Sequence, residues 1–248
     1  MSQSTVNRGL ISMGYWMLSS GLHPPPRLIQ IINEFSARKC LRDLIQRFEI
    51  NCVLDVGAHT GAFALILRRI GYEGHIVCFE PNPESFRKLC KRFKADRFWR
   101  GMNIALGSKN TTQSFNITRE PNLSSFLTPR TAAIDHVLSV KVTRLDSIFE
   151  DVIHSIDAPR VFMKMDTQGC DVDVVKGAGA CIHDILGMQS EISVQPIYEN
   201  MPYYLDALRY YESCGFELVN LFSAYHNKKY GNIIEYDCLM ARLNRVFD

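Results

Sequence analysis

The chain has 248 residues, of which 46% are hydrophobic and 22% are charged. This composition is typical of a globular protein with a buried core, in one domain with or without appendages. Its 28 basic and 26 acidic side chains nearly cancel, which argues against nucleic acid as the main partner.

Eight cysteines are spread along the chain without a Cys-x-x-Cys pair, so a zinc site is not expected. Several stand in apolar runs, as Cys78 does, which is typical of buried thiols in a reducing compartment; we therefore expect a cytoplasmic protein. No apolar run reaches the roughly 18 residues of a membrane span. Residues 9–22 faintly resemble a signal peptide, but they run into His-Pro-Pro-Pro instead of a small-residue cleavage site.

Residues 1–50 are predicted to form a leader and a helical appendage, and residues 51–248 the main domain. The mildly apolar segment 10–22 is expected to pack on its own domain, with weak contact to a membrane surface or a partner as the alternatives. Prolines at 24–26 end this leader. Residues 28–48 then place apolar side chains at helical spacing, which predicts one or two helices covering a sheet.

From residue 52 onward, predicted strands alternate with predicted helices, which indicates an α/β fold with a mostly parallel sheet. The strands fall at 52–56, 75–80, 97–105, 160–166 and 186–194, and the helices at 62–70, 83–93, 171–181 and 203–213, with a shorter helix from 145. Two last strands at 216–222 and 236–242 flank a polar loop at 225–232. Their closeness in sequence predicts an antiparallel pair at the sheet edge.

The alternation is interrupted between residues 107 and 144. Residues 111–118 and 138–144 read as strands, and the stretch 121–129 between them is rich in loop-forming residues. We interpret this part as an inserted, hairpin-like excursion near the mouth of the site, because long loops in compact domains are often functional lids.

The first strand and the loop after it are the clearest sign of a ligand site. Residues 53–61 read as a buried strand, a glycine-bounded turn and the start of a helix, where free backbone N–H groups favour an anionic group. A dinucleotide fingerprint needs glycine where His59 and Ala62 stand, so it is absent. Asp55 and the Gly57-x-x-x-Gly61 turn suit a ligand with an ammonium and a carboxylate, as in S-adenosylmethionine.

Polar side chains also end the next two strands, where ligands bind in sheets of this kind. Glu80 is placed to accept hydrogen bonds from ribose hydroxyls. The alternative interpretation is that Glu80 lies at a helix start, where the helix dipole favours a carboxylate. Asn103 suits the edge of an adenine, because its side-chain amide both donates and accepts hydrogen bonds. That Asn103 is a plain turn residue is nearly as good an interpretation.

Two acidic side chains end the later strands. Asp166 is expected beside the first loop, where it can orient an ammonium, act as a general base or hold a metal. Glu191 is costly inside an apolar strand unless it is used or forms an ion pair with Lys164. No histidine pair has ligand spacing. His59 caps or lines the site, while His136 and His226 are weak base candidates.

Together these motifs resemble, in their order, the FkbM-type methyltransferases, a branch of the class I S-adenosylmethionine-dependent enzymes. The resemblance spans about residues 51–243 and rests on Asp55-Val-Gly-Ala-His-Thr-Gly61, Phe79-Glu-Pro-Asn82, Asn103-Ile-Ala-Leu-Gly107, Ser124-Ser125, Lys164-Met-Asp-Thr-Gln-Gly-Cys-Asp171, Lys176-Gly-Ala178 and Glu191-Ile-Ser193. It implies a Rossmann-like, seven-stranded sheet whose last strand is antiparallel. It also implies methyl transfer to a hydroxyl of a sugar, glycolipid or natural-product acceptor.

The resemblance assigns S-adenosylmethionine to positions near the strand ends. Asp55, Gly57 and Gly61 would surround its methionine part, Glu80 its ribose, Asn103 and Ile104 its adenine, and Asp166 its methyl end. The full set of implied cofactor residues adds Ala58, His59, Thr60, Phe63, Pro81, Asn82, Ala105 and Ser124. The choice of acceptor would lie in residues 121–129, outside the resemblance.

The expected reaction is in-line methyl transfer to a small-molecule or glycan acceptor. Asp166 is the first candidate for the base, followed by Glu191 and a lid histidine such as His136. No complete metal-ligand set is present, and none is expected to form. Two alternatives stay open: a nicotinamide-dependent oxidoreductase on the same sheet, and a non-catalytic cofactor-binding module of a biosynthetic complex.

Overall fold

The computed structural model describes residues 15–16, 19–21, 26–227 and 229–243, and the chain divides into two units, residues 1–39 and 40–248. Most of the predicted contact segment 10–22 lies outside the described residues; Tyr15 and Trp16, which are described, are exposed. Helix α2 (Pro26–Arg47) follows this segment and crosses the boundary between the units. None of the described helices is long and apolar enough to cross a membrane.

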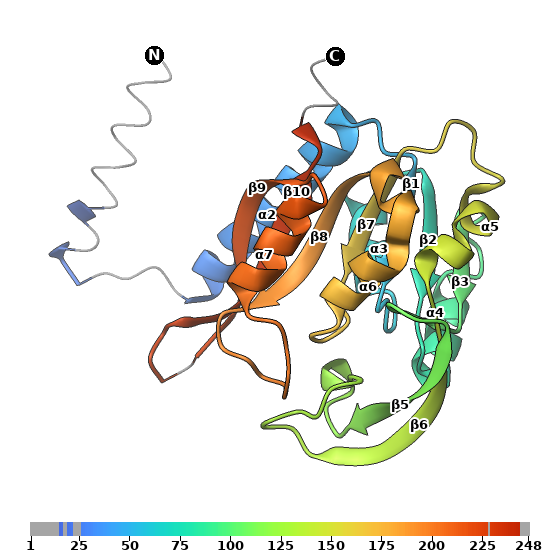
Figure 1. Cartoon of the computed structure of the whole chain (residues 1–248). Coiled ribbons are helices and arrows are strands. Elements are labelled where there is room, and N and C mark those ends of the chain that lie inside the picture. The colour runs from blue at the N-terminus through green and yellow to red at the C-terminus, as the bar shows by residue number, and fades with distance from the viewer. Residues whose placement is uncertain (1–14, 17–18, 22–25, 228, 244–248) are drawn as a thin grey trace, which may run out of the picture. The chain divides into compact units, whose positions relative to one another are not determined.

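A seven-stranded sheet organises the second unit, in the order β3-β2-β1-β7-β8-β10-β9 (Figure 1). The strands are β1 (Cys52–Val56), β2 (His75–Phe79), β3 (Trp99–Met102), β7 (Val161–Met165), β8 (Ile185–Ser193), β9 (Glu217–His226) and β10 (Ile233–Ala241). All pairings from β3 to β8 are parallel, whereas β10 is antiparallel to both of its neighbours. The predicted α/β, Rossmann-like sheet with an antiparallel last strand is therefore confirmed.

Helices cover both faces of this sheet because successive strand residues point to opposite sides. On β1, Val53 belongs to one buried cluster and Leu54 to the other. The end of α2, with α3 (Ala62–Arg69) and α4 (Pro83–Arg92), packs on the Val53 face; α5 (Phe149–Ile153), α6 (Asp171–Ala178) and α7 (Tyr204–Ser213) pack on the Leu54 face. The described part of the chain also contains three short 3₁₀ helices, η1 (Pro121–Leu123), η2 (Leu145–Ser147) and η3 (Gly179–Asp184).

The predicted strand 97–105 is wrong as a single strand. The structure has β3 in the main sheet and β4 (Ala105–Leu106) in a second sheet. Asn103 stands at the break, and its side-chain nitrogen donates to the carbonyl oxygens of Glu80 and Pro81. These bonds turn the chain away from β2 after Met102.

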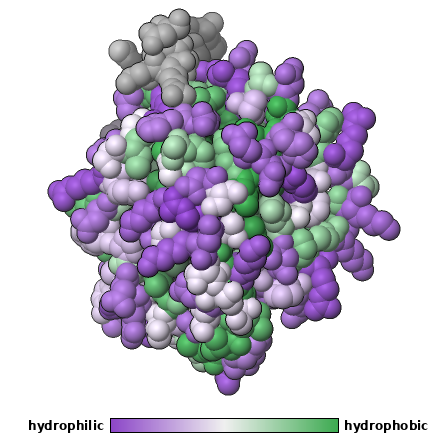
Figure 2. Space-filling model, turned by 45° about the vertical axis from the view of Figure 1, so that its right-hand side comes forward, coloured by the Kyte–Doolittle hydropathy of each residue, from purple (hydrophilic) through white to green (hydrophobic). Residues whose placement is uncertain are grey.

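The second sheet carries the interruption seen in the sequence, in the order β4-β6-β5, with β5 (Thr111–Thr118) and β6 (Ile134–Thr143) antiparallel. Strand β6 begins earlier than predicted, because residues 134–137 pair with β5 although they are exposed and lack an alternating pattern. Apolar residues gather at the lower end of Figure 2, the end where Figure 1 places β5 and β6. Two apolar residues of β6, Ile134 and Val137, are exposed.

The two late strands are longer than predicted. Strand β9 continues to His226 and β10 begins at Ile233, so the predicted loop 225–232 shrinks to 227–232. Polar residues such as Tyr225 and Glu235 pair across the hairpin, which a search for apolar runs does not detect. Their pairing brings the polar start of β10 to the carboxyl end of β8.

Candidate active site

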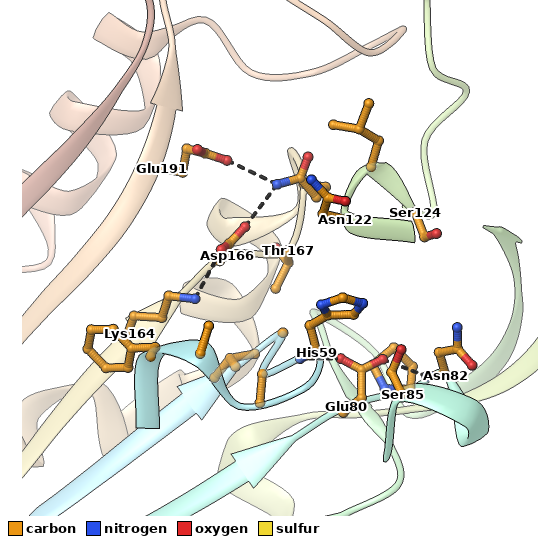
Figure 3. A pocket seen from close by; sticks show the side chains of 18 of the residues that line it. His59, Glu80, Asn82, Ser85, Asn122, Ser124, Lys164, Asp166, Thr167 and Glu191 are labelled. Carbon is orange, nitrogen blue, oxygen red and sulfur yellow. Dashed lines mark hydrogen bonds and ion pairs between the residues drawn. The ribbon is translucent and has the colours of Figure 1, made fainter. Parts of the chain in front are cut away.

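A cavity of about 880 Å³ opens at the carboxyl ends of β1, β2, β7 and β8, the place where open parallel sheets bind ligands. The strand-end loops line one side, and the segment between β5 and β6 lines the other. Figure 3 shows His59, Glu80 and Asn82 facing Asn122 and Ser124 across this space. Residues from β9 and β10 complete the lining.

The loop after β1 passes very close to the loop after β7. Gly57 has φ +78°, and a Cβ atom there would collide with the backbone carbonyl of Asp166. Gly61 has φ +83° at the start of α3, and a Cβ atom there would meet Leu89 and Phe93 of the neighbouring helix region. Glycine therefore lets the β1 loop lie against β7 and α4, with its backbone open to the cavity.

Glu80 is buried at the β2 end of the cavity. Its two carboxylate oxygens accept backbone N–H groups, one from His59 at 2.7 Å and one from Asn82 at 2.8 Å. Burial raises the pKa of Glu80 to about 7, and these two hydrogen bonds offset only part of that rise. Burial also lowers the pKa of the His59 imidazole, so this ring is neutral near pH 7.

Lys164 joins two carboxylates at the β7 end. Its Nζ lies 3.1 Å from Oδ2 of Asp166 and 3.7 Å from Oδ1 of Asp55, which faces it in register on β1. Burial lowers the pKa of Lys164, but Asp166 and Asp55 outweigh that effect and raise it above its ordinary value. Asp55 is fully buried behind the cavity wall, so the structure makes it a partner of Lys164 and does not place it at the cavity surface.

Gln168 links Asp166 to Glu191 (Figure 3). Its Nε2 donates to Oδ1 of Asp166 at 2.9 Å and to Oε2 of Glu191 at 3.1 Å. The Lys164–Glu191 ion pair considered from the sequence is not found among the described residues, because Lys164 is taken by Asp166 and Asp55.

The two linked carboxyl groups differ in their acidity. Burial raises the pKa of Asp166, but Lys164 and Gln168 outweigh it and hold that pKa below its ordinary value. For Glu191, burial raises the pKa well above its usual range, and the nearby carboxylates of Asp166 and Glu235 raise it further. Asp237 and Asp171 act in the same direction.

Most of the residues singled out from the sequence meet at the cavity. The lining includes Gly57, Ala58, His59, Phe63, Glu80, Pro81, Asn82, Ala105, Ser124, Asp166 and Glu191. Asp55, Thr60, Gly61, Asn103, Ile104 and His136 lie outside the lining. Asn103 uses its amide nitrogen on backbone carbonyls, and His136 is an exposed residue of β6 that pairs with Asp135.

Several lining residues were not singled out from the sequence, above all Glu235 and Asp237 on β10, and Gln168 was quoted only as part of the motif 164–171 without a role. Glu235 and Asp237 are two residues apart on a strand, so they share a face, and this spacing was a detectable signal. Across the described residues, no group of three or more His, Cys, Asp or Glu side chains is arranged to hold a metal ion.

Comparison with known proteins gives one family match. Residues 55–218 match the model described as Methyltransferase FkbM domain. Among solved structures, an Aeropyrum pernix fibrillarin with natively bound S-adenosyl-L-methionine is 14% identical with a TM-score of 0.45, covering 77% of this chain and 66% of that chain. A Geobacter metallireducens precorrin-6y C5,15-methyltransferase is 11% identical with a TM-score of 0.42, covering 81% and 86%. The chain thus spans about two thirds of the fibrillarin. A comparison with curated protein sequences finds no match.

Proposed function

The chain belongs to the FkbM methyltransferase domain family, and we propose that it methylates a hydroxyl oxygen of a small-molecule or glycan acceptor. Its cofactor, S-adenosylmethionine, supplies an electrophilic methyl group on a sulfonium sulfur. The family match decides against the nicotinamide-dependent oxidoreductase. What the protein must add is a fit for the cofactor, an aligned acceptor and a group that takes the hydroxyl proton.

The cavity residues fit the two polar ends of this cofactor. A volume of about 880 Å³ is in the range of small-molecule sites. At one end, the buried Glu80 carboxyl accepts two backbone N–H groups and forms no ion pair with any residue that the structure describes, which suits it to accept hydrogen bonds from ribose hydroxyls. At the other end, the ionised Asp166 suits an ammonium group. Gly57 keeps the backbone between them accessible.

The linked pair of Asp166 and Glu191 carries the proposal of hydroxyl chemistry. Neighbouring carboxyl groups whose pKa values are displaced in opposite directions mark a division of roles. Asp166 stays ionised near pH 7 and is a weak proton acceptor, which favours a binding role. Glu191, with its raised pKa, is the better general base. We therefore assign the acceptor proton to Glu191, ahead of Asp166 and of the exposed His136.

The acceptor side of the cavity combines aromatic surfaces with polar groups. Phe115 of β5 and Phe126 of the segment between β5 and β6 pack edge to face, and both line the cavity together with Tyr225 of β9. Such walls suit the apolar faces and hydroxyl groups of sugars and natural products.

The buried, free cysteines support a reducing compartment such as the cytoplasm.

Isotope transfer to defined acceptors tests this function. The protein is incubated with S-adenosylmethionine bearing a trideuterated methyl group, and with neutral methyl hexosides, their 2-amino analogues, a glycolipid and a ribosomal RNA fragment. We expect mass spectrometry to find the label on a hydroxyl oxygen of a glycoside or glycolipid. Label on an amine nitrogen or on RNA would overturn the hydroxyl assignment. Tight binding of S-adenosylhomocysteine without any transfer would favour the non-catalytic module.

Two substitutions then separate the roles of the paired carboxyl groups. Glu191→Gln should lower kcat by about 10²–10⁴-fold and leave S-adenosylhomocysteine affinity within about twofold, as expected on losing a general base. Asp166→Asn should instead weaken that affinity by about tenfold or more, because an ammonium loses its charged partner. Glu212→Gln, on the exposed side of α7, is the matched control. The opposite pattern would return the base role to Asp166.

A further inference from the structure

Gln168 adopts an unusual backbone conformation in the loop after β7. Its φ is +53°, a region that residues other than glycine occupy only when their surroundings hold them there. Its carbonyl oxygen accepts a hydrogen bond from Oγ of Ser125 at 2.7 Å, and Ser125 is fully buried. The Ser125 side chain of the inserted segment therefore holds the backbone of this loop from the acceptor side.

The side-chain amide of Gln168 is fully used. Both hydrogens of Nε2 go to carboxylates, those of Asp166 and Glu191, and Oε1 accepts the Tyr198 hydroxyl at 2.7 Å. A flipped amide would point its oxygen at two carboxylates, so the hydrogen-bond network determines this orientation. One nitrogen thus holds two acidic groups that would otherwise repel each other.

Tyr198 is held as firmly as the amide that it contacts. Its side chain is 1% exposed, and its hydroxyl also lies 3.0 Å from the carbonyl oxygen of Leu123. Backbone bonds tie the same segments together, from Arg130 N–H to the Ile197 carbonyl and from Glu199 N–H to the Thr128 carbonyl, each at 2.9 Å. The side-chain amide of Gln168 is consequently held by Tyr198, which belongs to one of two joined segments, residues 123–130 and 197–199, on the acceptor side of the cavity.

We propose that Gln168 is a positioning residue, which sets the geometry and the protonation of the Asp166–Glu191 pair and is itself set by Tyr198 and Ser125. The proposal rests on the assignment of Glu191 as the proton acceptor. An N–H donor favours the ionised form of a carboxyl group. Gln168 thereby opposes the effect of burial and of four carboxylates that raise the pKa of Glu191, those of Asp166, Glu235, Asp237 and Asp171. Asp237 is the cross-strand partner of Glu191 on β10, and Lys164 lowers the pKa of the neighbouring Asp166.

The titration of Glu191 is the direct readout of this role. In protein labelled with ¹³C at glutamate side-chain carboxyls, and saturated with S-adenosylhomocysteine, the Glu191 signal is assigned by its loss in Glu191→Gln. Gln168→Met keeps the length of the side chain and removes both donors, so the pKa of Glu191 should rise by about one unit. Tyr198→Phe, which frees the amide without touching Glu191, should raise it by a smaller amount.

Two matched variants show whether such a shift is specific. Gln113→Met changes an exposed glutamine of β5, and Tyr72→Phe removes a buried hydroxyl that donates to the His75 carbonyl far from the pair. Neither should move the Glu191 signal. An unchanged Glu191 pKa in folded Gln168→Met and in Tyr198→Phe would overturn the proposal, and Tyr198→Phe decides alone where Gln168→Met does not fold.

The same measurements separate this proposal from the proposed function. If Glu191→Gln turns over as fast as the wild-type protein, the assignment of Glu191 as the base is refuted, whatever the Gln168 variants show. If turnover does depend on Glu191, but the pKa of Glu191 is unchanged in Gln168→Met and Tyr198→Phe, only the proposed role of Gln168 is refuted.

Discussion

At the scale of single residues, burial and the nearest charged or hydrogen-bonding groups together set the charge of each acidic side chain in the cavity. Glu80 is 5% exposed, and its pKa of about 7 means that it is half ionised near neutral pH in the unliganded protein. The folded chain holds this proton more tightly than the unfolded chain does. Glu80 therefore lowers the free energy of unfolding as the pH rises from about 4.5 towards 7.

The same titration of Glu80 predicts that S-adenosylhomocysteine, the product formed from the cofactor, binds with an affinity that depends on pH. Ribose hydroxyls donate best to an ionised carboxylate, and the ionised fraction of Glu80 rises from about one tenth at pH 6 to about nine tenths at pH 8. Calorimetry should show S-adenosylhomocysteine binding about tenfold more tightly at pH 8 than at pH 6. Glu80→Gln should weaken binding and lose this slope. Glu84→Gln, on the exposed first turn of α4, should keep it, and an equal slope in both variants would remove the ribose role.

The sequence predicted which residues lie at the cavity better than it predicted which side chains pair with each other. The strand ends marked Glu80, Asp166 and Glu191 as cavity residues, because the alternation of strands and helices fixes where those ends meet. The pairing of Asp55 with Lys164 depends on β1 and β7 being neighbours in register, although more than 100 residues separate them. No local pattern contains that information.

At the scale of elements, the cavity depends on two loops being in contact. The β1 loop can approach the β7 loop only because Gly57 has no side chain. A backbone bond from Asp166 N–H to the Val56 carbonyl, 3.0 Å long, holds the same contact. The Asp166 end of the proposed cofactor site is thus placed by one close approach of the main chain.

Substitution of two glycines isolates that contact. Gly57→Ala and Gly71→Ala both put a side chain at positive φ, but only the Cβ at Gly57 meets a backbone oxygen. Gly71→Ala should lower the free energy of unfolding by about 1 kcal/mol, and Gly57→Ala by about 3 kcal/mol or more. Urea unfolding measures both, and S-adenosylhomocysteine affinity should fall only in Gly57→Ala. Equal losses in the two variants would show that the close approach contributes nothing beyond backbone strain.

Elements with a regular apolar pattern were predicted well, and those shaped by polar pairing were not. Strand β5 was predicted with its observed bounds, because residues 111–118 alternate. The start of β6 and the end of β9 lie on exposed surface, where pairing with a neighbouring strand sets the length. The break at Asn103 arises from hydrogen bonds to β2 and its following loop, which are distant in sequence.

At the scale of the whole molecule, the end of α2 belongs to the core of the second unit. Leu41, Leu44, Ile45 and Phe48 are buried in the cluster that also holds Val53 of β1. The sequence placed the start of the main domain at residue 51, after these side chains. Burying each of them contributes about 1.5–3 kcal/mol, and together they approach the total stability of a typical domain.

Two truncated chains test where the folding unit begins. A chain of residues 40–248 should melt cooperatively and bind S-adenosylhomocysteine with about the affinity of the full chain. A chain of residues 51–248 should be insoluble or lack a cooperative transition, because it lacks Ile50 as well as those four side chains and exposes the residues that pack against all five. Circular dichroism melting compares the two. A cooperative transition of 51–248 near that of the full chain would support the boundary at residue 51.

The place of β10 has a consequence for how the protein is made. This strand is the last in the described chain, yet it lies between β8 and β9 and not at the sheet edge. While a ribosome is still adding the residues up to Ala241, β8 and β9 have no strand between them, and the wall containing Glu235 and Asp237 is missing. This wall of the cavity therefore forms only after the residues of β10 have been added, so a nascent chain exposes the unpaired edges of β8 and β9 to other chains until then.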